Sequence, residues 1–290
     1  MSNSLLSKLI LGTVQFGLNY GINNRLGKPK EEEVDDILLT AFNNNIEVLD
    51  TAEAYGDAQK RIGDFHKRHP EIRFDIITKF YDKNFSGDFE KRIKGDIDEL
   101  NIETLYAYMF HNITDFFKYQ HGLDTLFKMK QKGVIKKIGV SVYTNDEVLD
   151  IIESGVEIDL VQLPFNLLDN NNKRLSVLKR LKEKNIEVHT RSVFLQGLFF
   201  MNDLPDSLKV FSRELEYLKE IAKKNNTNIK DMALNYCVAN KYIDKVLIGV
   251  DTKNQLSDNI NSLKGLNKKT IEEVDKIDFE NTKYLNPANW

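Results

Sequence analysis

Four residues that can hold or exchange protons stand just after apolar stretches of the sequence. Asp50, Lys79 and His111 each end or directly follow such a stretch, and Tyr55 comes five residues after Asp50. A tyrosine hydroxyl ordinarily titrates near pKa 10, so it needs a neighbouring cation to give up its proton near neutrality. Lys79 can supply that cation, and Asp50 can keep it charged and oriented. Each residue alone is explained as a polar strand end, but together they predict a proton-transfer site.

The segments that position these residues form an alternation of strands and helices. Eight short runs crowd apolar and β-branched residues, most without a polar alternate, as expected for parallel strands buried on both faces. These runs cover 9–13, 46–50, 74–79, 105–110, 138–142, 158–163, 186–190 and 245–249. Between them apolar residues step by three or four, as at Val34, Ile37 and Leu38, and Gly133 and Gly155 stand where two such helices must stop. The punctuation therefore agrees with the periodicity.

Eight strand-to-helix repeats predict an α/β fold, either a (β/α)8 TIM barrel or an open doubly wound sheet. In a barrel, the C-terminal ends of the strands build the active site. We expect a single domain over 1–290. A long insertion, 197–228, precedes the last strand, and its apolar residues could line a substrate wall or simply pack helices. The tail 266–290 is expected to pack on or near the barrel mouth.

Composition limits the function classes. The chain has 290 residues with 41 Lys and Arg against 44 Asp and Glu, a net charge of −3 that gives no electrostatic reason to bind nucleic acid or a membrane. Its one cysteine, Cys237, cannot form an internal disulfide and lies on an apolar stripe, which predicts a core position. No signal or membrane segment is visible. We expect a cytoplasmic monomer or dimer that acts on a small molecule.

Five motifs resemble those of the aldo-keto reductase family. Residues 50–56 (DTAEAYG) are similar to the family's DTAxxYG loop, and residues 11–17 (LGTVQFG) to its opening segment. Residues 138–141 (IGVS) resemble its IGVSN motif, residues 161–166 its NQxxYN segment, and residues 248–259 its cofactor-binding element near the end. The motifs follow the family's order from about residue 9 to about 263. This order favours the barrel over the open sheet.

The resemblance implies an enzyme that reduces an aldehyde or ketone by hydride transfer from a nicotinamide cofactor, without a metal. Tyr55 would be the general acid, Lys79 and Asp50 would tune it, and His111 would help to hold the carbonyl oxygen. The resemblance also implies a cofactor-binding set: Gly12, Thr13, Val14, Asp50, Ser141, Gln162, Arg191, Ser192, Phe194, Gly197, Gly249, Asp251, Gln255, Asp258 and Asn259. Within it, Ser141 and Gln162 would hydrogen-bond the nicotinamide carboxamide.

Two departures from the family pattern concern the nicotinamide end of this set. The asparagine that follows the family's serine is Val142 here, which removes one amide contact. Arg191 stands where many members have a tyrosine that stacks under the nicotinamide. A guanidinium plane can also stack, so cofactor binding is still expected.

A further departure concerns the adenosine 2′-phosphate. Gly249 and Gln255 occupy positions that carry Lys and Arg in members strongly selective for NADPH, Asp251 lies nearby, and only Lys253 is a possible replacement. A carboxylate would repel the phosphate and could bind a ribose hydroxyl instead. NADPH is slightly favoured as the cofactor, with NADH as the alternative.

Other functions remain open. The same residues could serve a cofactor-binding regulatory subunit with little turnover, or a sugar isomerase or alcohol dehydrogenase, and a sugar-derived carbonyl is a possible substrate. His66 and His69 have a helical spacing that could bind a metal, but the charged residues around them favour a solvated helix end. The asparagine runs 43–45 and 170–172 are likewise interpreted as solvated helix ends or loops.

Overall fold

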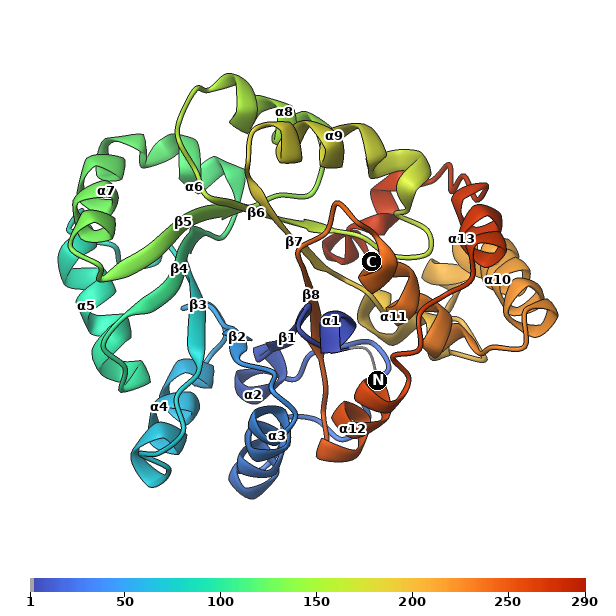
Figure 1. Ribbon diagram of the computed structural model, residues 1–290, viewed down its shortest axis with the longest axis horizontal. Coiled ribbons are helices and arrows are strands. Elements are labelled where there is room, and N and C mark those ends of the chain that lie inside the picture. Colours follow the sequence, from blue (N-terminus) through green and yellow to red (C-terminus); the bar gives the residue numbers. More distant parts are fainter. Residues whose placement is uncertain (1–2) are drawn as a thin grey trace.

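Eight short parallel strands close into a barrel in the computed structural model, which describes residues 3–290 (Figure 1). Each strand pairs with the next along the chain, and the last pairs with the first, with Leu9 opposite Val246. This closure confirms the barrel and excludes the open sheet. The strands are β1 (Leu9–Gly12), β2 (Val48–Asp50), β3 (Asp75–Phe80), β4 (Leu105–Phe110), β5 (Ile135–Ser141), β6 (Leu160–Pro164), β7 (Glu187–Arg191) and β8 (Lys245–Gly249).

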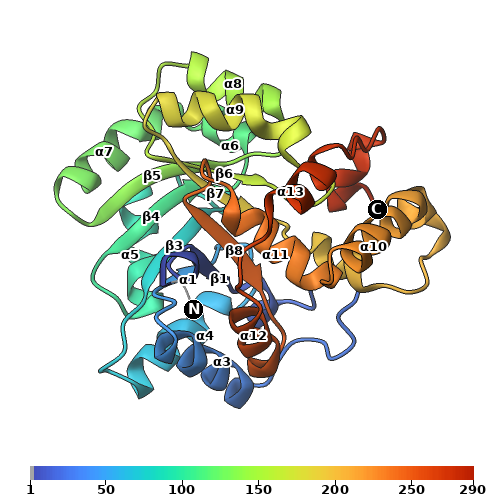
Figure 2. The same ribbon diagram turned by 45° about the vertical axis from the view of Figure 1, so that its right-hand side comes forward.

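Helices surround the barrel, and α10 and α13 stand out to one side of it in both ribbon views (Figures 1 and 2). Gly133 and Gly155 follow α7 and α8 with φ of 75° and 69°, so both act as the predicted helix stops. The helices are α1 (Asn3–Leu6), α2 (Val14–Gly17), α3 (Glu31–Asn43), α4 (Ala58–Arg68), α5 (Phe89–Leu100), α6 (Ile113–Lys118), α7 (Leu123–Gln131), α8 (Asn145–Glu153), α9 (Asn171–Glu183), α10 (Ser212–Lys224), α11 (Ile229–Ala239), α12 (Lys253–Asn261) and α13 (Lys268–Asp275).

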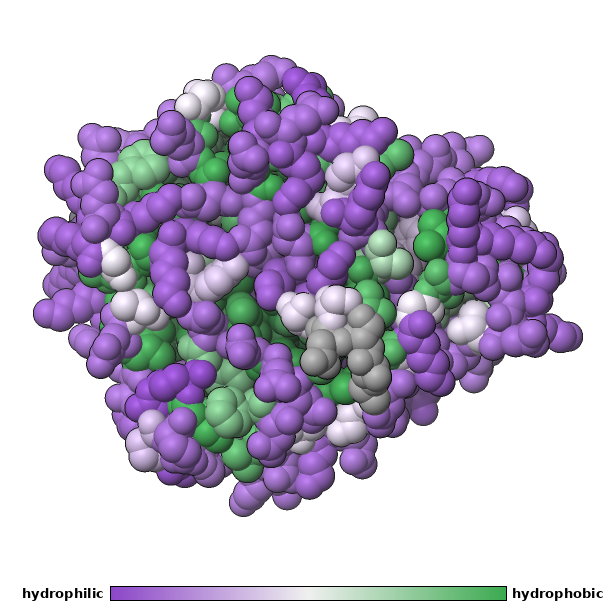
Figure 3. Space-filling view, viewed as in Figure 1, coloured by the Kyte–Doolittle hydropathy of each residue, from purple (hydrophilic) through white to green (hydrophobic). Residues whose placement is uncertain are grey.

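The apolar core has two layers, because each barrel strand buries both of its faces. A small cluster fills the barrel itself, with Ile10, Ile77 and Met109 among its members. A much larger layer packs between the outer faces of the strands and the helices, and it includes Cys237, as expected for a core cysteine. Polar side chains cover most of the face seen in Figure 3, with apolar groups visible mainly in the gaps between them.

Strand boundaries differ from expectation where a turn residue has a buried apolar side chain. The run 46–50 was expected to be a strand throughout, but β2 begins at Val48. The backbone N–H of Ile46 donates to the carbonyl of Ala41, so Ile46 still belongs to the turn that ends α3 while its side chain is buried. Burial of an apolar side chain therefore extends beyond the ladder of paired residues.

Two expectations of solvated polar runs are wrong at one residue each, although both runs do lie at helix ends. His66 is fully buried rather than solvated, and its Nδ1 lies 2.8 Å from the carbonyl oxygen of Leu100 at the end of α5. Asn170 is also buried, and its amide donates to the carbonyls of Val274 and Ile277 at 2.8 and 3.0 Å. Both side chains satisfy helix-end carbonyls inside the protein, so they hold elements together.

The tail beyond α13 packs on the insertion that precedes α11. Phe279 stacks on Phe211 with ring centroids 4.8 Å apart, and Trp290 meets the same phenylalanine at 6.0 Å. Residues of the short 3-10 helices η4 (Thr282–Leu285) and η5 (Pro287–Asn289) share a cavity with Tyr143, just beyond β5. Within residues 3–290, no helix is long and apolar enough to cross a membrane.

Candidate active site

A buried ion pair lies at the C-terminal ends of β2 and β3. The ammonium of Lys79 donates to Asp50, and the two side chains are only 1% and 2% exposed. Lys79 also donates to the carbonyl of Thr51 at 2.9 Å, and the second carboxylate oxygen of Asp50 accepts from the amide of Gln162 at 2.8 Å. Because each charge is met by an opposite charge and by further hydrogen bonds, the pair is stable without water.

Tyr55 reaches over this pair from the loop between β2 and α4. The Lys79 ammonium lies 5.3 Å from the centre of the Tyr55 ring. The imidazole of His111 meets the same ring edge to face, with centroids 5.6 Å apart and planes at 77°. The four residues predicted to form a proton-transfer site are therefore neighbours in the structure.

The loop that carries Tyr55 is braced by a residue that the sequence analysis missed. The side chain of Glu53 is 5% exposed, and its carboxylate accepts from the guanidinium of Arg92, the hydroxyl of Tyr108 at 3.0 Å and the backbone N–H of Tyr81 at 2.9 Å. On the other side of the loop, a Cβ on Gly17 would lie 1.7 Å from the carbonyl oxygen of Tyr55. Only a glycine permits this close approach.

The electrostatics keep the phenol of Tyr55 protonated. Burial, together with the charge of Asp50, raises the pKa of Tyr55 well above its usual value, and the charge of Arg191 acts in the opposite direction. Burial lowers the pKa of His111 to about 3, so its imidazole is neutral. Lys79, the cation expected from the sequence, lies 5.3 Å from the ring centre with Asp50 as its counter-ion. Arg191 is a second cation that favours ionisation of the tyrosine.

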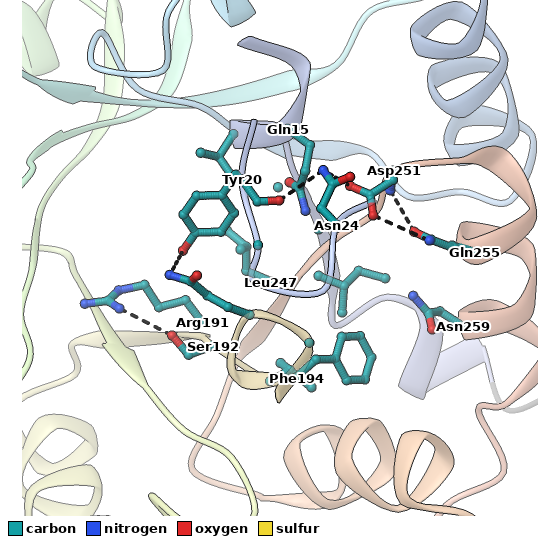
Figure 4. A pocket seen from close by; sticks show the side chains of 18 of the residues that line it. Gln15, Tyr20, Asn24, Arg191, Ser192, Phe194, Leu247, Asp251, Gln255 and Asn259 are labelled. Carbon is teal, nitrogen blue, oxygen red and sulfur yellow. Dashed lines mark hydrogen bonds between the residues drawn. The ribbon is translucent and has the colours of Figure 1, made fainter. Parts of the chain in front are cut away.

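A pocket of ≈ 330 Å³ opens beside Tyr55 and runs toward α12 (Figure 4). Most of the predicted cofactor-binding residues line it: Gly12, Val14, Asp50, Gln162, Arg191, Ser192, Phe194, Gly197, Gly249, Asp251, Gln255, Asp258 and Asn259. They come from the ends of β1, β2, β6, β7 and β8 and from the segments that follow. The barrel mouth thus gathers residues that are far apart in the sequence.

The remaining predicted residues lie just outside this lining. Lys79 and Ser141 are buried at the ends of their strands, with Ser141 paired to Gln162 in the β5–β6 register, and His111 stands against Tyr55. The hydroxyl of Thr13 donates to the carbonyl of Asp50 at 3.0 Å, so its hydrogen bond joins the ends of β1 and β2.

Asp251 and its hydrogen-bond partners lie at the end of the pocket near α12. The carboxylate of Asp251 accepts from Asn24 at 3.1 Å, and the backbone N–H of Asp251 donates to Gln255 at 2.7 Å. Lys253, the possible phosphate ligand, instead donates to Asp36 on α3 at 2.5 Å. Lys230, in the first turn of α11, does line the pocket, although sequence reasoning gave no signal for it.

Arg191 has an unusual setting at the opposite end. Its guanidinium stacks on the ring of Tyr143, 4.0 Å from the ring centre. It donates to the carbonyl of Val142 at 3.1 Å and lies 3.4 Å from the hydroxyl of Ser192. In Figure 4 it extends away from Asp251 and its neighbours. One face of the guanidinium is therefore covered by the ring of Tyr143, whereas the stacking partner expected from the sequence was the nicotinamide.

Comparisons with known proteins find relatives over most of the chain. The family model described as the aldo/keto reductase family matches residues 8–279. The chain is 26% identical to L-galactose dehydrogenase of Arabidopsis thaliana, over 93% of this chain and 91% of that one. It is 25% identical to D-arabinose 1-dehydrogenase of Saccharomyces cerevisiae, over 86% and 81%. An aldo-keto reductase from Bacillus halodurans, solved in its holo form, superposes with a TM-score of 0.76 at 18% identity, covering 93% and 92% of the two chains.

Proposed function

Because this chain belongs to the aldo/keto reductase family of oxidoreductases, we propose that it reduces an aldehyde or ketone to the alcohol by hydride transfer from NADPH or NADH, with Tyr55 as the general acid. The observation that carries the proposal is a pair of contacts: the Tyr55 ring lies next to the Lys79 ammonium, which in turn pairs with Asp50. A charged pair with almost no solvent exposure, placed directly behind a phenol, is costly to bury and is typical of a functional site.

Features of the pocket support a dinucleotide as its ligand. In Figure 4, Tyr20 and Arg191 lie on one side and the hydrogen-bonding side chains of Asp251, Gln255 and Asn259 lie on the other. Phe194 and Leu247 form an apolar wall between them. The buried Oε1 of Gln15, which faces this pocket, has no hydrogen-bond partner among the described residues. Unused polar groups beside an apolar wall are the usual features of a nucleotide site.

The residues of the chain divide the reaction between them. A bound nicotinamide cofactor supplies the hydride. Tyr55 donates its phenolic proton to the substrate oxygen as negative charge develops there, and the Lys79 ammonium stabilises the resulting phenolate. His111, being neutral, can donate one ring N–H to the same oxygen. The phenolate then regains a proton from solvent, which leaves the alcohol and the starting form of the enzyme.

We propose NADPH as the slightly preferred cofactor, with Ser141 and Gln162 at its carboxamide. The family resemblance supports NADPH, while Asp251 at the far end of the pocket supports NADH. Lys230, also in the lining, supplies positive charge for the phosphates that both dinucleotides carry.

A titration tests the proposed function. The purified protein is titrated with NADPH and NADH, and 4-nitrobenzaldehyde is then added while the cofactor absorbance is followed. We expect oxidation of the cofactor in step with formation of the alcohol. Tight cofactor binding without turnover, for this and a panel of sugar aldehydes, would favour the regulatory subunit. Conversion of a sugar with no net cofactor oxidation would favour an isomerase.

A further inference from the structure

Arg191 is a permanently charged group that lacks a carboxylate partner. It is half-buried at the last position of β7, and within residues 3–290 no acidic oxygen lies within ion-pair distance of it. The acid that its charge influences, Asp169, is already held by the guanidinium of Arg174 at 2.6 Å. Because a guanidinium cannot lose its proton in a protein, its charge must be met in some other way.

The contacts of Arg191 leave part of its donor capacity unused. The stack on Tyr143 covers one face, and the two hydrogen bonds to Val142 and Ser192 occupy one N–H on each terminal nitrogen. A guanidinium carries five N–H donors in one plane. The remaining donors have no partner among the described residues, and Arg191 lines the pocket that Tyr55 also lines.

The barrel mouth around these residues carries a net positive charge. Lys79 and Asp50 cancel one another, and His111 is neutral because its pKa is about 3. The tyrosine phenol is protonated as well, so the charge of Arg191 stands alone at this end of the pocket. Asp251, another carboxylate of the pocket lining, lies at the opposite end in Figure 4.

We propose that Arg191 binds an oxyanion on the carbonyl substrate, so that the enzyme is selective for carbonyl compounds that bear a carboxylate or a phosphate. This inference rests on the proposed function. The planar fork of a guanidinium matches both oxyanions, and such charge-assisted hydrogen bonds are strongest where water is partly excluded. The stack on Tyr143 fixes the plane of the fork and so pre-organises it for the ligand.

Matched aldehydes of nearly equal shape test the proposal. The substrates are 3- and 4-nitrobenzaldehyde, 3- and 4-carboxybenzaldehyde, and 4-formylphenyl phosphate, and the readout is the ratio of kcat/KM for the anionic aldehyde to that for its nitro counterpart. We expect this ratio to fall by roughly ten- to a hundredfold in Arg191→Gln for at least one anionic aldehyde. Arg191→Lys keeps the charge without the fork and should retain part of the ratio. The carboxylate and phosphate arms show which oxyanion is taken.

Further measurements distinguish binding of the substrate oxyanion by Arg191 from a general effect of charge and from a loss of cofactor binding. Arg213→Gln removes an equal charge at an exposed position on α10 and should leave the ratio within about twofold. Affinity for NADPH, measured by the change in its fluorescence, shows any loss of cofactor binding. In the unmodified protein, benzoate should inhibit at least about tenfold better than benzamide, which does not depend on the folding of a variant.

The inference and the proposed function fail in different ways. Absence of turnover with every aldehyde contradicts the proposed function. Turnover with an unchanged ratio of kcat/KM values in Arg191→Gln overturns the inference. So does a variant that binds NADPH more weakly and loses equal factors of kcat/KM for nitro and carboxy aldehydes, because that result indicates that Arg191 binds the cofactor. Equal inhibition by benzoate and benzamide overturns it as well.

Discussion

Tyr55 and His111 are in direct ring contact, edge to face, with centroids 5.6 Å apart. Within residues 3–290 the imidazole makes no hydrogen bond of its own, and burial keeps it neutral by lowering its pKa to about 3. A neutral imidazole can donate a hydrogen bond without adding a second charge next to the phenol. The geometry therefore suits a carbonyl oxygen that accepts from both side chains.

Replacement of the phenol should separate chemistry from binding. We expect Tyr55→Phe to lower kcat by about a hundredfold or more, because the general acid is lost, while the affinity for the cofactor stays within about fivefold. The measurements are the initial rate with 4-nitrobenzaldehyde and a fluorescence titration with NADPH. As a control, Tyr20→Phe removes another hydroxyl from the same pocket and should cost far less. A fully active Tyr55→Phe enzyme would remove Tyr55 from the mechanism.

Charge at the far end of the pocket should control the choice between dinucleotides. Asp251 is partly buried, and burial raises the pKa of its carboxyl. We expect Asp251→Ser to increase the preference for NADPH over NADH by roughly three- to tenfold, since it removes a repulsive charge near the 2′-phosphate. The ratio of the two dissociation constants measures this. Asp206→Ser, at an exposed position, should leave that ratio unchanged. An unmoved ratio in Asp251→Ser would show that this carboxylate does not face the phosphate.

Lys230 should act on both dinucleotides alike. It lies in the first turn of α11, where the helix dipole adds positive potential, and it forms no ion pair with any described residue. We expect Lys230→Met to weaken NADPH and NADH by roughly tenfold each and to reduce the salt dependence of binding. Lys223→Met, on the exposed side of α10, is the control. Equal affinities for Lys230→Met and the unmodified protein would place the phosphates elsewhere.

Glu187, at the start of β7, should make the stability of the protein depend on pH. Burial alone would raise the pKa of Glu187, but hydrogen bonds from His189, Lys137 and Tyr106 lower it to about 2, below its ordinary value of 4.5. A lowered pKa means that the stabilisation is complete above pH 4.5 and is lost as the pH falls toward 2. Between pH 4.5 and pH 2, we expect the free energy of unfolding of Glu187→Gln to fall by about 2 kcal/mol less than that of the unmodified protein.

Urea unfolding at several pH values checks this expectation through the slope of stability against pH. The slope is informative even if Glu187→Gln is less stable at neutral pH because Lys137 loses its partner. Glu47→Gln, at an exposed position, is the matched control and should follow the unmodified protein. Parallel curves for Glu187→Gln and the unmodified protein would contradict the prediction.

The barrel could be predicted because strands buried on both faces leave continuous apolar runs. β4 and β8 begin and end where the pattern predicts. β2 does not, since Ile46 is buried by its side chain while its backbone closes the turn after α3. A hydrophobic pattern reports burial, whereas a strand is defined by pairing, and the two differ wherever a loop contributes to the core.

The site could be predicted only where residue type and strand end coincide. Glu53 was missed because its importance comes from Arg92 and Tyr108, which join it only in the folded chain. Lys230 was missed because only the folded chain brings α11 to the pocket. The hypothesis for His66 was wrong because its charged neighbours hid a buried stripe that includes Phe65. In each case the sequence alone does not show which residues lie together in the folded chain.

Closure of the barrel by β1 and β8 sets a condition on synthesis. One wall of the pocket comes from the first 24 residues and another from Leu247 to Asn259, and these walls meet only when Leu9 pairs with Val246. A chain emerging from the ribosome therefore offers no complete pocket until its last strand has been translated. Any stabilisation that a bound nucleotide provides can then act only after release of nearly the whole chain.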